Sequence, residues 1–291
     1  MIEPVLVTGA GGFVGGHVSQ LLRSRGIRVV AHARRPGPAI DWVADLTSAT
    51  AMQDPVLHDI AAVVHCAAAI PARSDAFARD NLAATATLAA WLASARTVRR
   101  IVHLSSVSVY QRPTGGQWMI GEDAATVDTD ETAANSYGAS KLACERCLDA
   151  VATQRPDVTV IHLRASSIYG PGMAPTTLLP VLAARARANQ PLLLRGPRPY
   201  VQNFVHVADV AELVFTAIQQ QTAPAIINAF SDDTYELGAL AELVRVGLDS
   251  SSQIVDESQA TAGPTPVFLN LAAKRLHSEF RSLRHHLADA T

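Results

Sequence analysis

Several features that would assign this chain to a special class of protein are missing. The longest apolar run, residues 60–70, is interrupted by His65 and is far shorter than the roughly 18 residues of a membrane-spanning helix. The chain carries 24 basic and 26 acidic residues, so the positive charge typical of nucleic-acid-binding proteins is absent. We therefore expect no membrane and no nucleic-acid partner, and a small molecule as the ligand.

Cysteine is scarce, and no export signal is visible. There are three cysteines, two of them in the pair Cys144 and Cys147, but no second Cys/His pair follows at the spacing of a zinc site. We expect reduced, inert thiols and no metal. The first predicted strand begins almost at Met1, without a basic segment followed by an apolar one, which predicts a cytoplasmic protein.

The sequence does contain ample core material and a regular alternation of elements. Apolar residues make up 48% of the 291 residues and charged residues 17%, as is typical of globular domains. Apolar β-branched runs at residues 4–8, 28–33, 61–66, 100–105 and 158–163 alternate with helical patterns. This alternation predicts an α/β fold, a doubly wound parallel sheet of the Rossmann type with helices on both faces.

Prolines divide the chain into short pieces after Ser166, which indicates a smaller C-terminal lobe for the substrate. Residues 203–213 then resume a strand and helix pattern. We therefore predict an interleaved division. The Rossmann domain takes residues 1–165 plus about 203–226, and the substrate-binding lobe takes about 166–202 plus 227–291. The polar segment 250–266 is expected to be a loop.

The first predicted strand runs directly into the glycine-rich turn TGAGGFVG and then into a helix. Gly9 permits the tight turn, Gly12 lets the backbone approach a pyrophosphate, and Gly15 lets helix and strand pack closely. Phe13 and Val14 open a helix whose N-terminal N–H groups favour phosphate. A plain connecting turn is the alternative, but strand, turn and helix together predict a dinucleotide cofactor.

The second predicted strand ends without the carboxylate that usually binds the ribose of NAD. Arg34 and Arg35 follow it, and a guanidinium can bind the 2′-phosphate of NADP. We therefore predict that Arg34 selects NADP(H) over NAD(H), although a solvated turn is the simpler alternative. Asp45, followed by Leu46, can accept a hydrogen bond from the adenine amino group, but an ordinary acidic residue before a helix is also consistent.

Tyr137 and Lys141 lie four residues apart at the start of a predicted helix, and so on one face of it. A phenol has a pKa of about 10, and a nearby ammonium lowers it and eases proton transfer. The strand that ends at Ser105 and Ser106 delivers a hydroxyl to the carboxyl edge of the sheet. Ser106 is the candidate that stabilises charge on a substrate oxygen.

These motifs resemble the extended short-chain dehydrogenases/reductases of the NAD-dependent epimerase/dehydratase family, in particular NADP-dependent nucleotide-sugar reductases and epimerases. VHCAA, DNL, SSVSVY, IYGP and NFVHVAD extend the resemblance over nearly the whole chain. It implies that Ser106 rather than Ser105 is catalytic. It also implies cofactor contacts by Ala67, Ala68 and the stretch after Arg164, here Ser166 and Ser167.

The resemblance further implies a homodimer through the helices that hold Asn81 and Tyr137. Tyr110 would be structural, and Cys144 and Cys147 would be packing or dimer-interface residues.

Departures from the family pattern concern the substrate. Similar nucleotide-sugar enzymes have Asn where Ser167 stands and Arg where Gln202 stands, and both serve the sugar diphosphate. Arg195 and Arg198 are candidate substitutes, and solvated loop residues are the equal alternative. The family's dehydratases have an Asp-Glu pair where this chain has Val-Ser after Ser106, so dehydration is not expected.

The leading interpretation is an NADP(H)-dependent oxidoreductase that reduces a ketone or a 4-keto sugar, the latter linked to a nucleotide, with Tyr137 as proton donor. The closest alternative is a nucleotide-sugar epimerase that oxidises and re-reduces its substrate on a tightly bound cofactor. An alternative of another class is a non-catalytic protein that senses NADP or acts as a scaffold.

Overall fold

The structure, a computed structural model, describes residues 2–128, 136–195, 197–198, 200–260 and 263–290. The chain forms two units, each assembled from separate stretches of sequence. The first comprises Met1–Gln111, Ala125–Ala165 and Val210–Ile227, and the second comprises Arg112–Ala124, Ser166–Asp209 and Asn228–Thr291. The division proposed from the sequence differs from these units mainly at residues 112–124 and 203–209.

A seven-stranded sheet lies at the centre of the first unit, in the order β12-β7-β5-β4-β1-β2-β3. The pairs from β3 to β7 are all parallel, which confirms the predicted α/β class. Chain order reverses between β1 and β4, the position where open α/β sheets bind ligands at their carboxyl edge. The strands are β1 (Val5–Thr8), β2 (Val29–Ala33), β3 (Trp42–Val43), β4 (Ala62–His65), β5 (Arg100–Ser106), β7 (Thr159–Ala165) and β12 (Ile226–Ala229).

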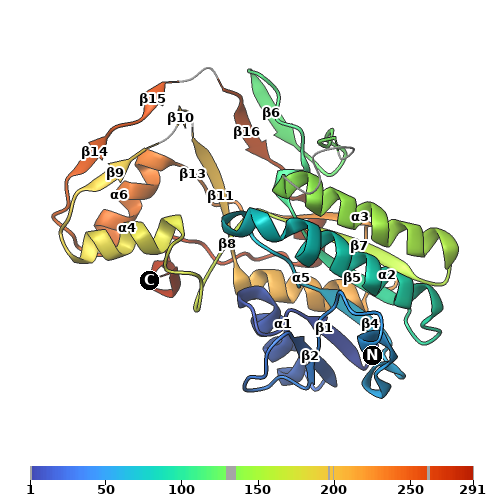
Figure 1. Cartoon of the computed structure of the whole chain (residues 1–291). Coiled ribbons are helices and arrows are strands. Elements are labelled where there is room, and N and C mark those ends of the chain that lie inside the picture. The colour runs from blue at the N-terminus through green and yellow to red at the C-terminus, as the bar shows by residue number, and fades with distance from the viewer. Residues whose placement is uncertain (1, 129–135, 196, 199, 261–262, 291) are drawn as a thin grey trace. The chain divides into compact units, whose positions relative to one another are not determined.

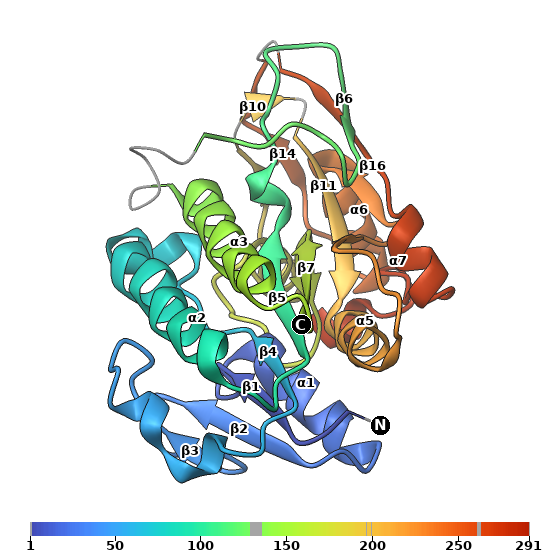
Figure 2. The same cartoon turned by 90° about the vertical axis from the view of Figure 1, so that its right-hand side faces the viewer.

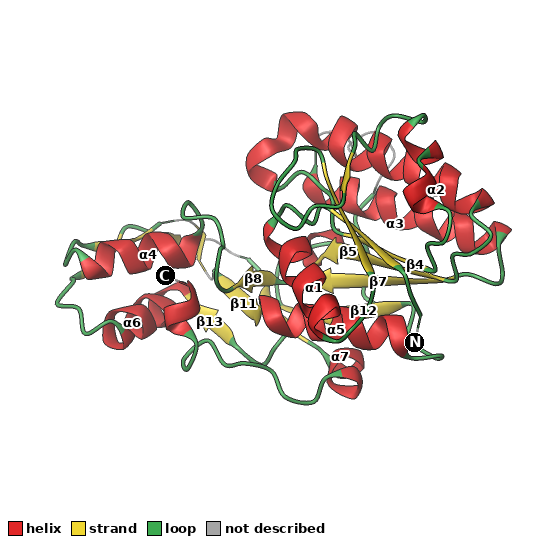
Figure 3. Cartoon of the chain, turned by 90° about the horizontal axis from the view of Figure 1, so that it is seen from below, coloured by secondary structure: helices red, strands yellow, loops and turns green. Residues whose placement is uncertain are grey.

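Helices cover both faces of this sheet, as the doubly wound prediction requires. Figures 2 and 3 show α2 and α3 on one face and α1 and α5 on the other. Gly26, at φ +76°, follows α1 and ends it. The helices are α1 (Phe13–Ser24), α2 (Ala84–Ser94), α3 (Tyr137–Gln154) and α5 (Val207–Gln219), with a π-helical turn (Phe77–Ala83) before α2 and a 3₁₀ turn (Val107–Val109) after β5.

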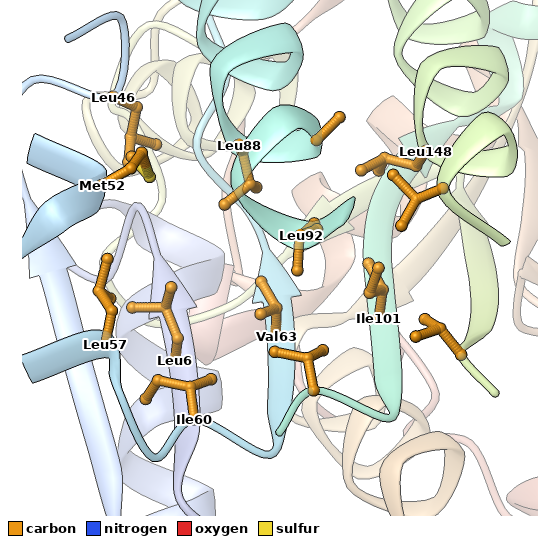
Figure 4. Close-up of a cluster of buried hydrophobic side chains, with 14 of the residues drawn as sticks. Leu6, Leu46, Met52, Leu57, Ile60, Val63, Leu88, Leu92, Ile101 and Leu148 are labelled. Atoms are coloured by element: carbon orange, nitrogen blue, oxygen red, sulfur yellow. The ribbon is translucent and has the colours of Figure 1, made fainter. Parts of the chain in front are cut away.

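One apolar row crosses the sheet face that lies under α2 and α3. Leu6, Val63, Ile101 and Val160 stand opposite one another on β1, β4, β5 and β7. They pack with helix residues such as Leu88 in a single buried cluster (Figure 4). Each large apolar side chain buried in this way stabilises the unit by about 1.5–3 kcal/mol.

A polar row crosses the same face two residues further along the strands. Thr8, His65, His103 and His162 are register partners on β1, β4, β5 and β7. Side chains two residues apart on a strand share a face, so this row also lies under α2 and α3. All four residues are buried, and they stand near the carboxyl edge of the sheet.

The second unit has its own apolar core between short strands and helices. Figure 1 shows α4 and α6 next to each other, and the side chains of both belong to one buried cluster. Its elements are β6 (Gln117–Ile120), β8 (Ser167–Tyr169), α4 (Leu178–Arg187), β9 (Leu192–Leu194), β10 (Pro197–Arg198), β11 (Val201–His206), β13 (Thr234–Glu236), α6 (Leu237–Gly247), β14 (Ile254–Asp256), β15 (Gln259–Ala260), β16 (Thr265–Phe268) and α7 (Leu271–Leu276).

The expectation of a loop over residues 250–266 is wrong in part. β14, β15 and the start of β16 fall within that stretch. β14 pairs with β9, and β16 pairs with β6, both distant in sequence. The polar composition of this segment does not predict strands. They form because each pairs with a strand that is distant in sequence.

Within the described part of the chain, no helix is both long enough and apolar enough to span a bilayer. The three cysteines, Cys66, Cys144 and Cys147, are free thiols in the structure.

Candidate active site

The glycine turn after β1 is shaped for close backbone approach. Gly9 has φ +71°, a conformation that L side chains rarely adopt. A Cβ on Gly15 would lie closer than 3.0 Å to the Gly9 carbonyl, so the first turn of α1 packs directly on the loop. No side chain caps α1 at Gly12, and no acidic residue stands in its first turn. Phe13 and Val14 thus open a helix end suited to a phosphate.

Neighbouring side chains hold this turn in place. His32 accepts a hydrogen bond from the Gly9 N–H (3.4 Å) and meets the Ala44 carbonyl at 3.0 Å through its other ring nitrogen. Thr8 accepts a hydrogen bond from the Ala67 N–H (3.3 Å). Ala67 and Ala68 follow β4 after Cys66, and the structure brings the Ala67 backbone against the glycine turn.

Arg34 follows β2 and takes part in a cluster of charges. Its guanidinium binds the Asp80 carboxylate at 2.8 Å, and its side chain is 43% exposed. Arg79 (3.2 Å) and Arg73 (3.9 Å) approach the same carboxylate. Neither additional arginine is predicted from the sequence, because both come from the segment after β4 and only the fold places them near Arg34.

Asp45 is already engaged by protein groups. Its carboxylate accepts hydrogen bonds from the N–H (3.0 Å) and the hydroxyl (2.8 Å) of Thr47, and Arg79 binds its second oxygen. These bonds lower the pKa of Asp45. The side chain of Leu46 is buried in the core of the first unit, which leaves its backbone as the part able to contact a cofactor.

The two serines at the end of β5 have different surroundings. Ser105 donates a hydrogen bond to Glu145, whose buried carboxylate also binds Arg164 through two bonds of 3.1 and 2.7 Å. Ser106 accepts a hydrogen bond from the Ser108 N–H at 3.1 Å, within the 3₁₀ turn. Ser105 therefore supports the buried ion pair of Glu145 and Arg164. Ser106 remains the candidate catalytic serine.

Tyr137 stands at the first turn of α3, with its ring 5.7 Å from that of Phe77. Burial raises the pKa of its phenol, a hydrogen bond with Ser106 lowers it in part, and Cys144 adds to the rise. The phenol thus keeps its proton at neutral pH and lies within hydrogen-bond reach of the Ser106 hydroxyl.

The expected effect of Lys141 on the tyrosine is not found in the chain itself. We expected its ammonium to lower the pKa of Tyr137, but the net shift is upward. Lys141 is buried, which lowers its own pKa, and its Nζ lies 3.2 Å from Nε2 of His103. The physical reason is that the apolar surroundings of the phenol outweigh the ammonium, which is directed to the histidine.

Asn81 joins the two sides of the site, a role that we did not assign to it. Its side-chain oxygen accepts a hydrogen bond from the Ala69 N–H (2.7 Å), and its amide donates to Ser140 (2.9 Å). Ser140 in turn donates to the Tyr137 carbonyl (2.8 Å). Asn81 thus links the loop after β4 to the start of α3. An amide side chain in an otherwise Ala-rich helical stretch is the sequence signal that could have indicated this.

Ser166 and Ser167 belong to the second unit. Ser166 donates a hydrogen bond to Asn203 (2.8 Å), and Ser167 accepts one from Gln202. Tyr200 donates to the same glutamine at 3.0 Å. The two residues that depart from the family pattern, Ser167 and Gln202, therefore bond to each other.

Neither candidate arginine of this unit has a demonstrated place in a site. Arg195 forms an ion pair of 2.7 Å with Glu257 and is 68% exposed, as a solvated loop residue would be. The side chain of Arg198 lies outside the described residues.

The first unit thus combines a phosphate-binding turn with a serine hydroxyl, a protonated phenol and a buried lysine at one edge of a parallel sheet. A hydroxyl and a phenol in contact can stabilise and protonate a carbonyl oxygen that receives a hydride. The turn fits a dinucleotide, because its glycines leave room for a pyrophosphate and no side chain caps the N-terminus of α1.

Comparisons with known proteins agree with the α/β fold described above. The model of the NAD dependent epimerase/dehydratase family matches residues 5–229. The chain is 26% identical to dTDP-glucose 4,6-dehydratase of Xanthomonas campestris, covering 88% of this chain and 74% of that protein. It is 32% identical to 2-alkyl-3-oxoalkanoate reductase of Stenotrophomonas maltophilia, covering 63% and 56%.

Solved structures give the same result. MoeE5 in complex with UDP-glucuronic acid and NAD is 28% identical, with a TM-score of 0.81 and coverage of 99% and 97%. UDP-glucose 4-epimerase of Thermotoga maritima, at 21% identity, shares the fold with a TM-score of 0.82 and coverage of 98% and 96%. The chain belongs to the NAD-dependent epimerase/dehydratase family of extended short-chain dehydrogenases/reductases, which are NAD(P)-dependent enzymes.

Proposed function

We propose that this protein is an NADP(H)-dependent reductase of a ketone or a 4-keto sugar. The glycine turn, Arg34 and Lys141 hold the cofactor, which supplies the hydride when bound. Ser106 donates a hydrogen bond to the substrate oxygen, and Tyr137 donates the proton that completes the alcohol. The observation that carries the proposal is the pairing of Tyr137 with Ser106, whose hydrogen bond offsets part of the rise that burial causes in the pKa of the phenol.

The protonation state of Tyr137 supports reduction. A proton donor must hold its proton before the reaction. Burial raises the pKa of this phenol, and the Ser106 hydrogen bond offsets only part of the rise. The tyrosine is therefore prepared to give a proton to a developing alkoxide.

A panel of carbonyl compounds tests the activity. Purified protein is incubated with NADPH or NADH and with 4-keto nucleotide sugars, 3-keto acids or simple ketones, and consumption of the reduced cofactor is followed. Tyr137→Phe should abolish consumption while NADPH binding remains. Consumption at the same rate in this variant would contradict the proposed role of the phenol.

We further propose that Arg34 selects NADP(H). No carboxylate ends β2, and the guanidinium of Arg34 is partly exposed, although MoeE5 is a structure with NAD. Arg34→Ala should weaken NADP binding by about 10- to 100-fold, the equivalent of one charge-assisted contact, and leave NAD binding unchanged. Arg35→Ala, the exposed neighbour, is the matched control. Equal losses for both cofactors would contradict the assignment.

For the substrate we propose a nucleotide-linked 4-keto sugar, because the relatives named above include enzymes of nucleotide sugars. The hydrogen bond between Ser167 and Gln202 and the similarity to a 3-oxoalkanoate reductase favour a free keto acid as second candidate. A thermal-shift panel separates the two, since a ligand that binds the folded state raises its melting temperature. Stabilisation by UDP- or dTDP-linked sugars supports the first candidate.

Epimerisation is the second candidate reaction, favoured by structural similarity to UDP-glucose 4-epimerase. An epimerase retains its cofactor and consumes no net NADPH, so product analysis without NADPH turnover would identify it. A non-catalytic sensor would bind NADP and keep its biological activity after Tyr137→Phe.

We also propose a homodimer that forms through α2 and α3, as the family resemblance implies. Light scattering combined with size-exclusion chromatography measures the mass in solution. A monomer at micromolar concentration would contradict this proposal.

A further inference from the structure

A continuous line of hydrogen-bonding groups runs from Lys141 to the surface of the first unit. Nζ of Lys141 lies 3.2 Å from Nε2 of His103, and Nδ1 of His103 lies 3.2 Å from Nδ1 of His162. Nε2 of His162 lies 3.0 Å from the carboxylate of Asp149. His103 and His162 are adjacent because they are register partners on β5 and β7, and Lys141 and Asp149 both belong to α3.

The donors and acceptors along this line fit a single arrangement. An ammonium can only donate, so Nε2 of His103 must accept, and the ring proton of a neutral His103 then resides on Nδ1. That proton is donated to Nδ1 of His162, which leaves Nε2 of His162 to donate to the carboxylate of Asp149. A carboxylate can only accept. The ammonium at one end and the carboxylate at the other therefore both require the proton on Nδ1 of His103 and on Nε2 of His162.

Burial raises the free-energy cost of any other tautomer of these two histidines. Lys141, His103 and His162 are 0–3% exposed, whereas the side chain of Asp149 is 60% exposed. Burial lowers the pKa of His103 well below its ordinary value, with Lys141 adding to the effect, so the ring is neutral and holds one proton. If the His103 ring carried its proton on Nε2, that N–H would face the ammonium of Lys141. The buried ammonium would then lose its acceptor, which is costly in free energy.

The other groups around this line keep their own partners. His65 is stacked on His103, with ring centroids 5.6 Å apart, but its ring nitrogens meet Thr8 (2.7 Å) and Thr85 (3.0 Å). Glu145, Cys144 and Cys66 lie within electrostatic reach of Lys141. Glu145 is held by Arg164. His103 is thus the neutral acceptor that faces the ammonium.

We propose that Asp149, His162 and His103 are positioning residues for Lys141. The carboxylate of Asp149 on the surface holds His162, and through it His103, in the tautomers that present a lone pair to the ammonium. The inference rests on the proposed role of Lys141 in the function above, and no proton needs to travel along the line. A row of histidines that merely fills polar space under α3 would have no such dependence on Asp149.

Nitrogen-15 NMR of histidine-labelled protein reads the tautomers directly and needs no substrate. In the wild type we expect the proton on Nδ1 of His103 and on Nε2 of His162. Asp149→Ala should remove the preference and give mixed tautomers for both rings. Asp149→Asn, which retains an acceptor oxygen, should preserve most of it. Asp59→Ala, a change at another exposed aspartate of the first unit, should leave both rings unchanged.

The lysines provide a second readout, because the sequence contains only two, Lys141 and Lys274. Carbon-13 labelling at Cε gives one signal for each, and the exposed Lys274 serves as an internal reference during a pH titration. In Asp149→Ala the titration of Lys141 should move to lower pH relative to Lys274, since a mixed His103 no longer accepts fully from the ammonium. The Asn variant should shift it less.

Three outcomes would overturn the inference: the opposite tautomer of either ring in the wild type, unchanged tautomers in Asp149→Ala, or changed tautomers with no movement of the Lys141 titration. These readouts are independent of turnover. If no carbonyl compound is reduced but they appear as expected, the proposed function fails and the positioning of Lys141 stands. If reduction occurs, kcat of Asp149→Ala should fall by about 5-fold, as for one lost hydrogen bond, with KM unchanged.

Discussion

At the scale of single residues, the two serines at the end of β5 show how neighbours in sequence take different tasks. The Ser105 hydroxyl points to a buried carboxylate, and the Ser106 hydroxyl meets the phenol of Tyr137. Successive side chains on a strand point to opposite faces. The same substitution at the two positions should therefore affect different properties.

Ser106→Ala should lower kcat by about 100- to 1000-fold, the range for loss of one donor to a developing oxyanion, with little change in melting temperature. Ser105→Ala should leave Glu145 short of a donor, costing about 1–3 kcal/mol of stability, and should retain turnover. Steady-state kinetics and thermal unfolding of the two variants form a matched pair. A reversed pattern would assign catalysis to Ser105.

The pH dependence of reduction follows from the sign of the shift at Tyr137. Its pKa is raised, chiefly by burial, so the protonated form is present throughout the neutral range and is lost only in alkaline solution. We expect a single-turnover rate that is constant around neutral pH and falls only in alkaline solution, above the ordinary pKa of a phenol. Loss of the proton from Lys141 acts in the same direction. A rate that rises with pH near neutrality would contradict the proton-donor role.

At the scale of elements, the start of α3 is held against the 3₁₀ turn that follows β5. A Cβ on Gly138 would lie closer than 3.0 Å to the Ser108 carbonyl. This contact places Tyr137, the residue before the glycine, next to Ser106, the residue that caps the turn. The geometry of the pair thus depends on the absence of one side chain.

Gly138→Ala should push α3 away from this turn, reduce turnover strongly and destabilise the protein by about 1–3 kcal/mol, as overpacking does. Gly16→Ala in α1 is the matched control. Its Cβ would meet the Ala10 carbonyl at 3.4 Å, an ordinary contact, and alanine favours a helix over glycine by about 1 kcal/mol. A melting temperature that rises in both variants would show that helix propensity, not the close contact, decides.

At the scale of the whole molecule, the first unit cannot be obtained by a single cut. Its last segment, Val210–Ile227, contains most of α5 and the start of β12. Arg100 on β5 donates to the Ala217 carbonyl at 3.0 Å, so α5 is fastened to the sheet. The segment that follows Ser166–Asp209 of the second unit is therefore part of the first unit.

A chain that ends at Ala165 should not fold stably. It loses the buried side chains of Val210, Leu213, Val214 and Ile218, each 0–1% exposed. At about 1.5–3 kcal/mol each, the loss is on the order of 6–12 kcal/mol, similar to the whole stability of a typical domain. Circular dichroism and urea unfolding measure the result. A cooperative transition in the shortened chain would contradict the interleaved organisation.

The sequence alone was sufficient for features that depend on neighbours along the chain. The strand, glycine turn and helix at residues 5–24 and the helix that begins at Tyr137 follow from local spacing, and the family was indicated by the resemblance of short motifs. The resumption of strand and helix at β11 and α5 also follows from local spacing. Such patterns are visible in one dimension because hydrogen bonding within a turn or a helix joins residues only a few positions apart.

The tertiary structure decided what depends on register and burial. The pairing of β14 with β9, the bond between Ser167 and Gln202, and the meeting of Arg34 with Asp80 join residues that are distant in sequence. The upward pKa shift of Tyr137 and the line from Lys141 to Asp149 likewise arise from the surroundings of each group. The physical reason is that desolvation and side-chain pairing are set by which groups folding brings together, and a linear sequence does not contain those distances.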